Sequence, residues 1–168
     1  MGVKFNRVKF SSFERSPLTS FCLAKGAEDV RSLIASLYEA TPKPELAYGI
    51  SDMDALEHYF PEYRYTAANQ ARLAAGVPSL ALYTSERGPI YTQLDHLLLR
   101  ESRFLPPDLL HPCGDLSIIG DTVVFMRAEH DQLWALAIKN AAFADQMKGV
   151  FRLLWASAKP GFTETVVG

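Results

Sequence analysis

LSIIGDTVVFM, residues 116–126, is the stretch of this 168-residue sequence that decides its fold. Its two halves, 116–119 and 122–126, are rich in residues that favour β-strands, and Gly120-Asp121 between them has the length of a tight hairpin turn. A third run of the same kind follows at 133–138. We therefore predict three consecutive antiparallel strands.

The segment from Ala141 to Ala158 has the apolar spacing of an amphipathic helix. Such a helix must bury its apolar face, so we expect it to pack on the sheet. Trp134, in the strand before it, is also expected to be a core residue. The apolar face of the helix consists of Phe143, Met147, Val150, Phe151, Leu154 and Trp155.

Upstream, short apolar runs alternate with helical patterns, as in α/β proteins. Strands are predicted at 18–23, 46–50, 79–83 and 100–105, with a further edge strand at 3–10. Helical segments are predicted after Gly26, from Met53 to about Ala75 with a junction at Pro61, and at 91–99. The resulting prediction is an α/β fold, a mixed β-sheet covered by helices on both faces. One domain at 18–158 would lie between a lead-in at 1–17 and a tail at 159–168.

Composition excludes several classes of protein. Seventeen basic and nineteen acidic side chains give a formal net charge of −2, which argues against an autonomous nucleic-acid binder, so any link to DNA would be indirect. Cys22 and Cys113 lie far apart and are expected to be free, buried thiols in a reducing compartment. The sequence has neither a secretory signal nor an apolar run near the roughly 20 residues that span a bilayer. We expect a cytoplasmic protein with no membrane partner.

Sequence motifs of common catalytic sites are absent. The chain has no phosphate-binding loop, dinucleotide fingerprint, nucleophile elbow or helical zinc motif, and its four histidines are not at metal-ligand spacings. We therefore predict no metal site, no cofactor and no enzymatic activity.

Asp52 and Asp54 follow the strand expected at 46–50. Ligands of open α/β sheets often bind where strands end and helices begin, so both carboxylates are ligand-binding candidates. The simpler interpretation is that they cap the next helix and interact favourably with its dipole.

Three further side chains are ligand-binding candidates. Arg72 follows Arg64 by two helical turns and could meet an anion on a shared face, although a solvated helix face is the simpler interpretation. Arg103 precedes Pro106 and Pro107, and could enter a pocket, although the prolines explain the turn without one. Tyr83 ends the strand expected at 79–83 and completes the set.

Four strings in the second half of the chain carry a family resemblance. They are RFLPP at 103–107, DLSIIGDTVVFM at 115–126, LAIKNAAFADQM at 136–147 and FRLLW at 151–155. Together they resemble the effector domain of TrmB-type transcriptional regulators, and thinner agreement extends the likeness over residues 18–158. The resemblance implies a phospholipase-D-like fold that has lost its catalytic residues.

The enzymes of that superfamily use the motif H-x-K-x-x-x-x-D, in which histidine is the nucleophile and lysine faces the phosphate. With Asp121 at the aspartate position, the histidine and lysine positions fall on Gly114 and Leu116. Neither residue can attack or neutralise a phosphate. The resemblance thus implies a scaffold without hydrolase activity.

The resemblance implies a non-catalytic regulatory domain that forms a homodimer and senses a small ligand. TrmB-type regulators contact DNA through a helix-turn-helix, which this sequence lacks, so DNA would be reached only through a missing or separate segment. Two alternatives stay open. One is a divergent phosphodiesterase that uses His111, Asp115 and Asp121, and the other is a purely structural interaction module.

Overall fold

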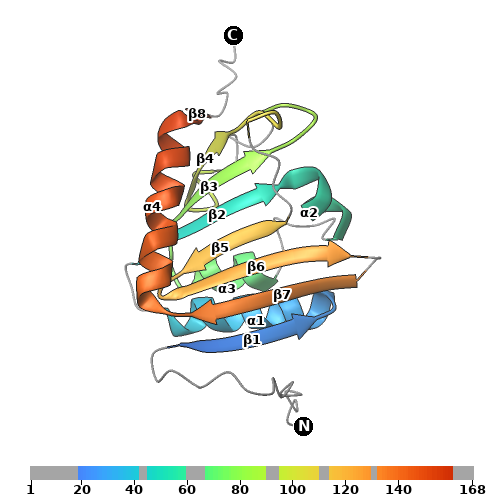
Figure 1. Ribbon diagram of the computed structural model, residues 1–168, viewed down its shortest axis with the longest axis vertical. Coiled ribbons are helices and arrows are strands. Elements are labelled where there is room, and N and C mark those ends of the chain that lie inside the picture. The colour runs from blue at the N-terminus through green and yellow to red at the C-terminus, as the bar shows by residue number, and fades with distance from the viewer. Residues whose placement is uncertain are drawn as a thin grey trace.

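The computed structural model describes residues 19–41, 45–59, 67–89, 95–109, 114–129 and 132–160. Within these ranges the chain forms one eight-stranded sheet with helices on both sides (Figure 1). The helices are α1 (Ala27–Ala40), α2 (Met53–Tyr59), α3 (Ala67–Ala74) and α4 (Ala141–Ser157). The strands are β1 (Ser20–Lys25), β2 (Ala47–Asp52), β3 (Ser79–Thr84), β4 (Arg100–Phe104), β5 (Asp115–Ile119), β6 (Thr122–Glu129), β7 (Gln132–Lys139) and β8 (Lys159–Pro160).

The sheet is mixed, as predicted. Its strand order is β1-β7-β6-β5-β2-β3-β4-β8. The strands β2, β3 and β4 run parallel to one another, whereas all other neighbours are antiparallel. Parallel neighbours need a crossover connection, and between β2 and β3 this connection contains α2 and α3. Antiparallel neighbours can be joined by short turns.

The central hairpin forms where the sequence predicts it. Ile119 of β5 pairs with Thr122 of β6, which leaves Gly120 and Asp121 as a two-residue turn. Gly120 has φ +61°, a conformation that glycine adopts without strain, and glycine at the first turn position matches the twist of the flanking strands.

Alternate residues of each strand point to opposite faces of the sheet. The front face is the one on which α4 packs, and the back face is the one on which α1 and α2 pack (Figure 1). Front-face residues buried under or beside α4 include Ile50, Leu82, Ile118 and Val123. Back-face residues buried with α1 and α2 are Ala24, Tyr83, Val124, Met126, Leu133, Ala135 and Ala137.

The closing helix α4 is fixed at its start and along its apolar face. Asn140 caps it, since its side-chain oxygen accepts a hydrogen bond of 2.9 Å from the backbone N–H of Phe143. Phe151 is 1% exposed, and its ring centroid lies 5.0 Å from that of Tyr48 and 5.5 Å from that of Trp155. The predicted apolar face is confirmed except at Val150, which is 42% exposed.

Some local predictions are wrong, and others lie outside the described residues. Residues 95–99 form turns instead of the predicted helix, because the Asp95 carboxylate accepts hydrogen bonds from Arg100 Nε and Ser102 N–H and folds the chain back onto β4. Cys22 is a free thiol as predicted, but it is exposed because it lies on the edge strand β1. The segment predicted as an edge strand at 3–10 is not among the described residues.

Candidate functional site

Three of the five ligand-binding candidates lie at one edge of the sheet. Asp52 ends β2, Asp54 is the second residue of α2, and Tyr83 is the second-last residue of β3. Because β5 is antiparallel to β2, its first residue, Asp115, lies at the same edge. We call this edge the carboxyl edge, since β2 and β3 both end there.

Asp52 acts as a helix cap. Its Oδ1 accepts hydrogen bonds from the backbone N–H groups of Asp54, at 3.0 Å, and Ala55, at 3.1 Å. These donors have no partner within the helix, so the carboxylate satisfies them and also opposes the positive end of the helix dipole. The geometry matches the simpler of the two interpretations.

Asp54 ties α2 to the loop that follows β3. Its carboxylate accepts hydrogen bonds from Ser85 Oγ at 3.1 Å, the backbone N–H of Glu86 at 2.7 Å and Arg87 Nε at 3.1 Å. Arg87 also donates to Glu57 at 2.6 Å. Desolvation opposes ionisation of Asp54, but the three hydrogen bonds and the nearby guanidinium hold its pKa below the ordinary value. The carboxylate is therefore charged and engaged by the protein itself.

The ring of Tyr83 belongs to the core. It is 3% exposed and lies on the back face, with its centroid 5.7 Å from that of Phe104. Burial of an aromatic ring in this way stabilises the packing of β3 against β4.

Arg72 lies at the opposite edge of the sheet, where β3 and β4 begin. It is 2% exposed, so the interpretation as a solvated helix face is wrong. Nη1 donates to the carbonyl of Val77 at 2.9 Å, and Nη2 donates to the carbonyl of Leu98 at 2.6 Å. A buried guanidinium must find such acceptors, and here they join the end of α3 to the turn before β4.

Arg103 lies on the front face beneath the end of α4. Its guanidinium is 4.4 Å from the centre of the Trp155 ring, and Nη1 donates to the Trp155 carbonyl at 3.0 Å. Glu101 forms an ion pair with Nη2 at 3.3 Å. The residue thus joins β4 to α4. The five candidates are distributed over two edges and one face, and their role in ligand binding stays a prediction.

Asp115 is the buried acid of the carboxyl edge. On the neighbouring strand β2, the hydroxyl of Ser51 donates a 2.7 Å hydrogen bond to the carboxylate of Asp115. Burial raises the pKa of Asp115 to about 6, although the hydrogen bonds from Ser51 and from the backbone N–H of Leu116 lower it. Ser51 was not among the sequence candidates, because its closeness to Asp115 depends on the pairing of distant strands.

Gly114 lies beside Asp115, at the position that the superfamily motif gives to the nucleophilic histidine. A Cβ at this residue would lie 2.4 Å from the carbonyl oxygen of Met126 and 2.9 Å from Cζ of Phe125. A side chain at Gly114 would therefore require the backbone of β6 to move. Leu116, at the lysine position, packs against the clusters beneath α4.

Two other features concern only the described parts of the chain. In these ranges no three His, Cys, Asp or Glu side chains converge as a metal site would require. None of the helices found there is long and apolar enough to cross a bilayer. His111, from the phosphodiesterase hypothesis, lies outside the described residues.

Replacing Asp115 by Asn is expected to change how stability depends on pH. The folded-state pKa of about 6 exceeds the ordinary carboxyl pKa of 3.8, so the stability associated with the neutral carboxyl is fully present below about pH 4 and is lost as the pH rises through 6. The Asp115→Asn variant cannot ionise. In urea unfolding it should gain up to about 3 kcal/mol relative to the unsubstituted chain between pH 4 and 7. Ser51→Ala removes a hydrogen bond that lowers the pKa, so the loss of stability should become larger and extend to higher pH. Parallel pH curves for Asp115→Asn and the unsubstituted chain would contradict a buried carboxyl with a raised pKa.

Comparison with known proteins gives matches in structure only. No protein-family model and no curated protein matches the sequence. Nuc from Salmonella typhimurium, a phospholipase D family member, aligns with a TM-score of 0.58 and 15% identity over 86% of this chain and 99% of Nuc. NucT from Helicobacter pylori aligns with a TM-score of 0.56 and 12% identity, again over 86% of this chain and 99% of the other.

TrmBL2, an archaeal chromatin protein, is a further structural match. It aligns with a TM-score of 0.57 and 13% identity over 83% of this chain, which spans only 54% of TrmBL2. At such identities a structural match shows a shared fold and no more. The predicted phospholipase-D-like α/β fold is therefore confirmed, as is the likeness in fold to a TrmB-type protein.

Proposed function

We propose that this chain is a non-catalytic regulatory domain, similar to the effector domain of TrmB-type regulators, that forms a homodimer and responds to a small ligand. The shared fold with TrmBL2 supports the comparison. The polar groups of the carboxyl edge also support it, because Asp52 and Asp54 hold together the elements of the fold instead of facing a reacting group.

The main support for this proposal is the identity and packing of Gly114 and Leu116. Phosphoryl transfer in the superfamily needs a nucleophile and a cation beside the phosphate. The two matching positions hold a glycine without room for a Cβ and a leucine packed beneath α4. The scaffold therefore keeps the shape of the enzymes without the groups that act on a phosphodiester.

The relation to duplex DNA is proposed to be indirect. TrmBL2 is described as a chromatin protein that binds DNA, and this chain matches about half of its length. With a formal net charge of −2, the chain lacks the excess of cations that duplex binding requires. In our proposal a separate or additional DNA-binding segment supplies that contact.

One observation favours the phosphodiesterase alternative. Asp115 has a pKa raised to about 6 by burial, a range suited to a general acid. Asp121, the second acid of that hypothesis, lies at the other end of β5, roughly 14 Å away at the rise per residue of a strand. It forms an ion pair with Lys139 at 3.5 Å. The two carboxylates are therefore too far apart to act on one phosphodiester.

A hydrolysis assay distinguishes the two functions. With bis(4-nitrophenyl) phosphate and single-stranded DNA as substrates, we expect no turnover above that of buffer, because no nucleophile stands at residue 114. A phospholipase-D nuclease serves as the positive control. Turnover that disappears in both Asp115→Asn and His111→Ala would contradict the proposal and establish the divergent phosphodiesterase.

Light scattering across a range of protein concentrations tests the dimer. We expect a mass of about twice 18.7 kDa at high concentration. A monomer at every concentration would contradict this part of the proposal. If the dimer forms but no small ligand raises the melting temperature, the purely structural interaction module becomes the better description.

A further inference from the structure

The helix α4 covers only part of the front face. Ala144, near its start, packs against Ile118 and Val123, at the end of β6 nearest the central turn. Beyond that contact, the front face of β1, β6 and β7 carries a set of apolar side chains that belong to none of the buried clusters, and Phe21 among them is 61% exposed. We call this set the open sheet face: Phe21, Leu23, Phe125, Trp134 and Leu136.

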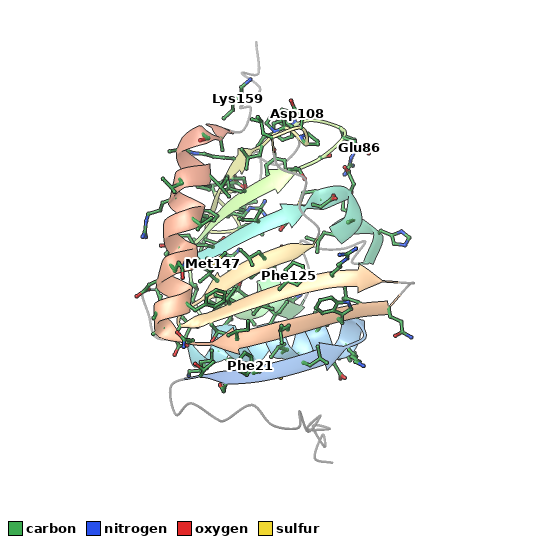
Figure 2. The ribbon with its side chains drawn as sticks, in the orientation of Figure 1. Phe21, Glu86, Asp108, Phe125, Met147 and Lys159 are labelled. Carbon is green, nitrogen blue, oxygen red and sulfur yellow. The ribbon has the colours of Figure 1, made fainter. Side chains whose placement is uncertain are left out.

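The part of the front face that α4 leaves uncovered can be followed in Figure 2. In Figure 2, Phe125 lies beyond α4, which is marked by Met147, on the part of β6 that the helix does not cross. Trp134 was expected in the core, but it is only half-buried, because no described helix crosses the front of β7 at this residue.

Two cations flank the aromatic pair of this face. The ring centroids of Phe125 and Trp134 are 5.6 Å apart. Lys25 of β1 and Arg127 of β6 are the direct cross-strand partners of Trp134, one on each side. Both cations are exposed, and neither forms an ion pair or a hydrogen bond with any residue that the structure describes.

Aromatic rings flanked by unpaired cations form the kind of surface on which unpaired bases stack while their phosphates are neutralised. Neighbouring strands are about 4.8 Å apart, so the backbones that carry Lys25 and Arg127 are separated by about 10 Å across Trp134. A nucleic-acid strand with a base on Trp134 has a phosphate on each side of it, whereas a mononucleotide has phosphate on one side only. An extended sheet face also suits a polymer better than a small molecule, because small-molecule sites are usually concave.

A second copy of the chain fits this surface less well. In a twofold contact the same patch meets itself, so Lys25 and Arg127 would face the identical cations of the other copy. Strand alternation puts one acidic position, Glu129, on this face two residues beyond Arg127, beside the two basic positions. The excess of basic over acidic positions favours an anionic partner over a second copy.

We propose that the open sheet face binds single-stranded nucleic acid, with bases stacked on Trp134 and Phe125 and phosphates paired with Lys25 and Arg127. This surface is separate from the carboxyl edge and from the regulatory role proposed above, and either can hold without the other. The proposal agrees with the net charge, because stacking supplies most of the affinity and only two phosphates are neutralised. Duplex DNA does not fit, since its bases are already stacked.

Fluorescence anisotropy with labelled oligonucleotides of about 12 residues tests this inference. We expect single-stranded DNA or RNA to bind and the matching duplex to bind at least about tenfold more weakly. Two neutralised phosphates predict a slope of about −1.4 for log K against log salt, and Arg127→Ala should reduce it to about −0.7. Arg152→Ala, which removes an exposed cation of α4, is the matched control and should leave binding unchanged.

Two variants test the stacking and charge contributions separately. Trp134→Leu keeps an apolar side chain in the sheet and should weaken binding about tenfold or more. Lys25→Glu combined with Arg127→Glu changes only exposed positions, so the chain should remain folded by circular dichroism and lose binding. Absence of binding to either single strand, or equal losses in the Arg152 control, would overturn the proposal. A dimer that Trp134→Leu dissociates would also overturn it, because the face would then belong to a second copy.

Discussion

The packing of α4 across the front of the sheet is the interaction on which the rest of the structure depends. Phe151 stands at its centre between Tyr48 and Trp155, and it joins the parallel half of the sheet to the closing helix. A helix is about 10 Å wide, whereas β6 and β7, with eight residues each, are about 27 Å long. One helix therefore covers the shorter central strands and leaves the far ends of β6 and β7 open.

The polar residues of the carboxyl edge follow from a second constraint, the need to satisfy buried donors and acceptors. Asp52, Asp54 and Ser51 each have partners within the chain, and these partners join α2, β3 and β5 at the carboxyl edge. At Gly114 the same edge is closed by the β6 backbone. The fold shared with Nuc and NucT is thus held at this edge by contacts within the chain, and in our proposals it serves as a scaffold with a second surface, the open sheet face.

Local patterns predicted most of the fold, and contacts between distant residues account for what they missed. The hairpin at Gly120 and the helix from Ala141 follow from the spacing of apolar residues, which repeats every two residues in a strand and every 3.6 in a helix. Such spacing can be recognised within a short stretch of sequence. Trp134 was predicted to be a core residue but is half-buried. The prediction failed because a sequence cannot show how far a helix from elsewhere in the chain extends over a strand. Arg72 was predicted to face solvent but is buried. Its carbonyl partner at Leu98 lies 26 residues away, so no local pattern could show this contact. For the same reason, sequence could identify Asp115 as an acid but not its partner across the sheet.

Substitution of Gly114 by alanine tests most directly whether the scaffold has lost the space for a nucleophile. The added Cβ would lie 2.4 Å from a backbone oxygen, so the free energy of unfolding should fall by about 1–3 kcal/mol. Gly49→Ala in β2 is the matched control, because nothing lies within 4 Å of the Cβ that it would add. Chemical unfolding of the two variants side by side should show loss of stability at Gly114 alone. Equal stability of both would mean that residue 114 has room for a side chain, and would contradict the account.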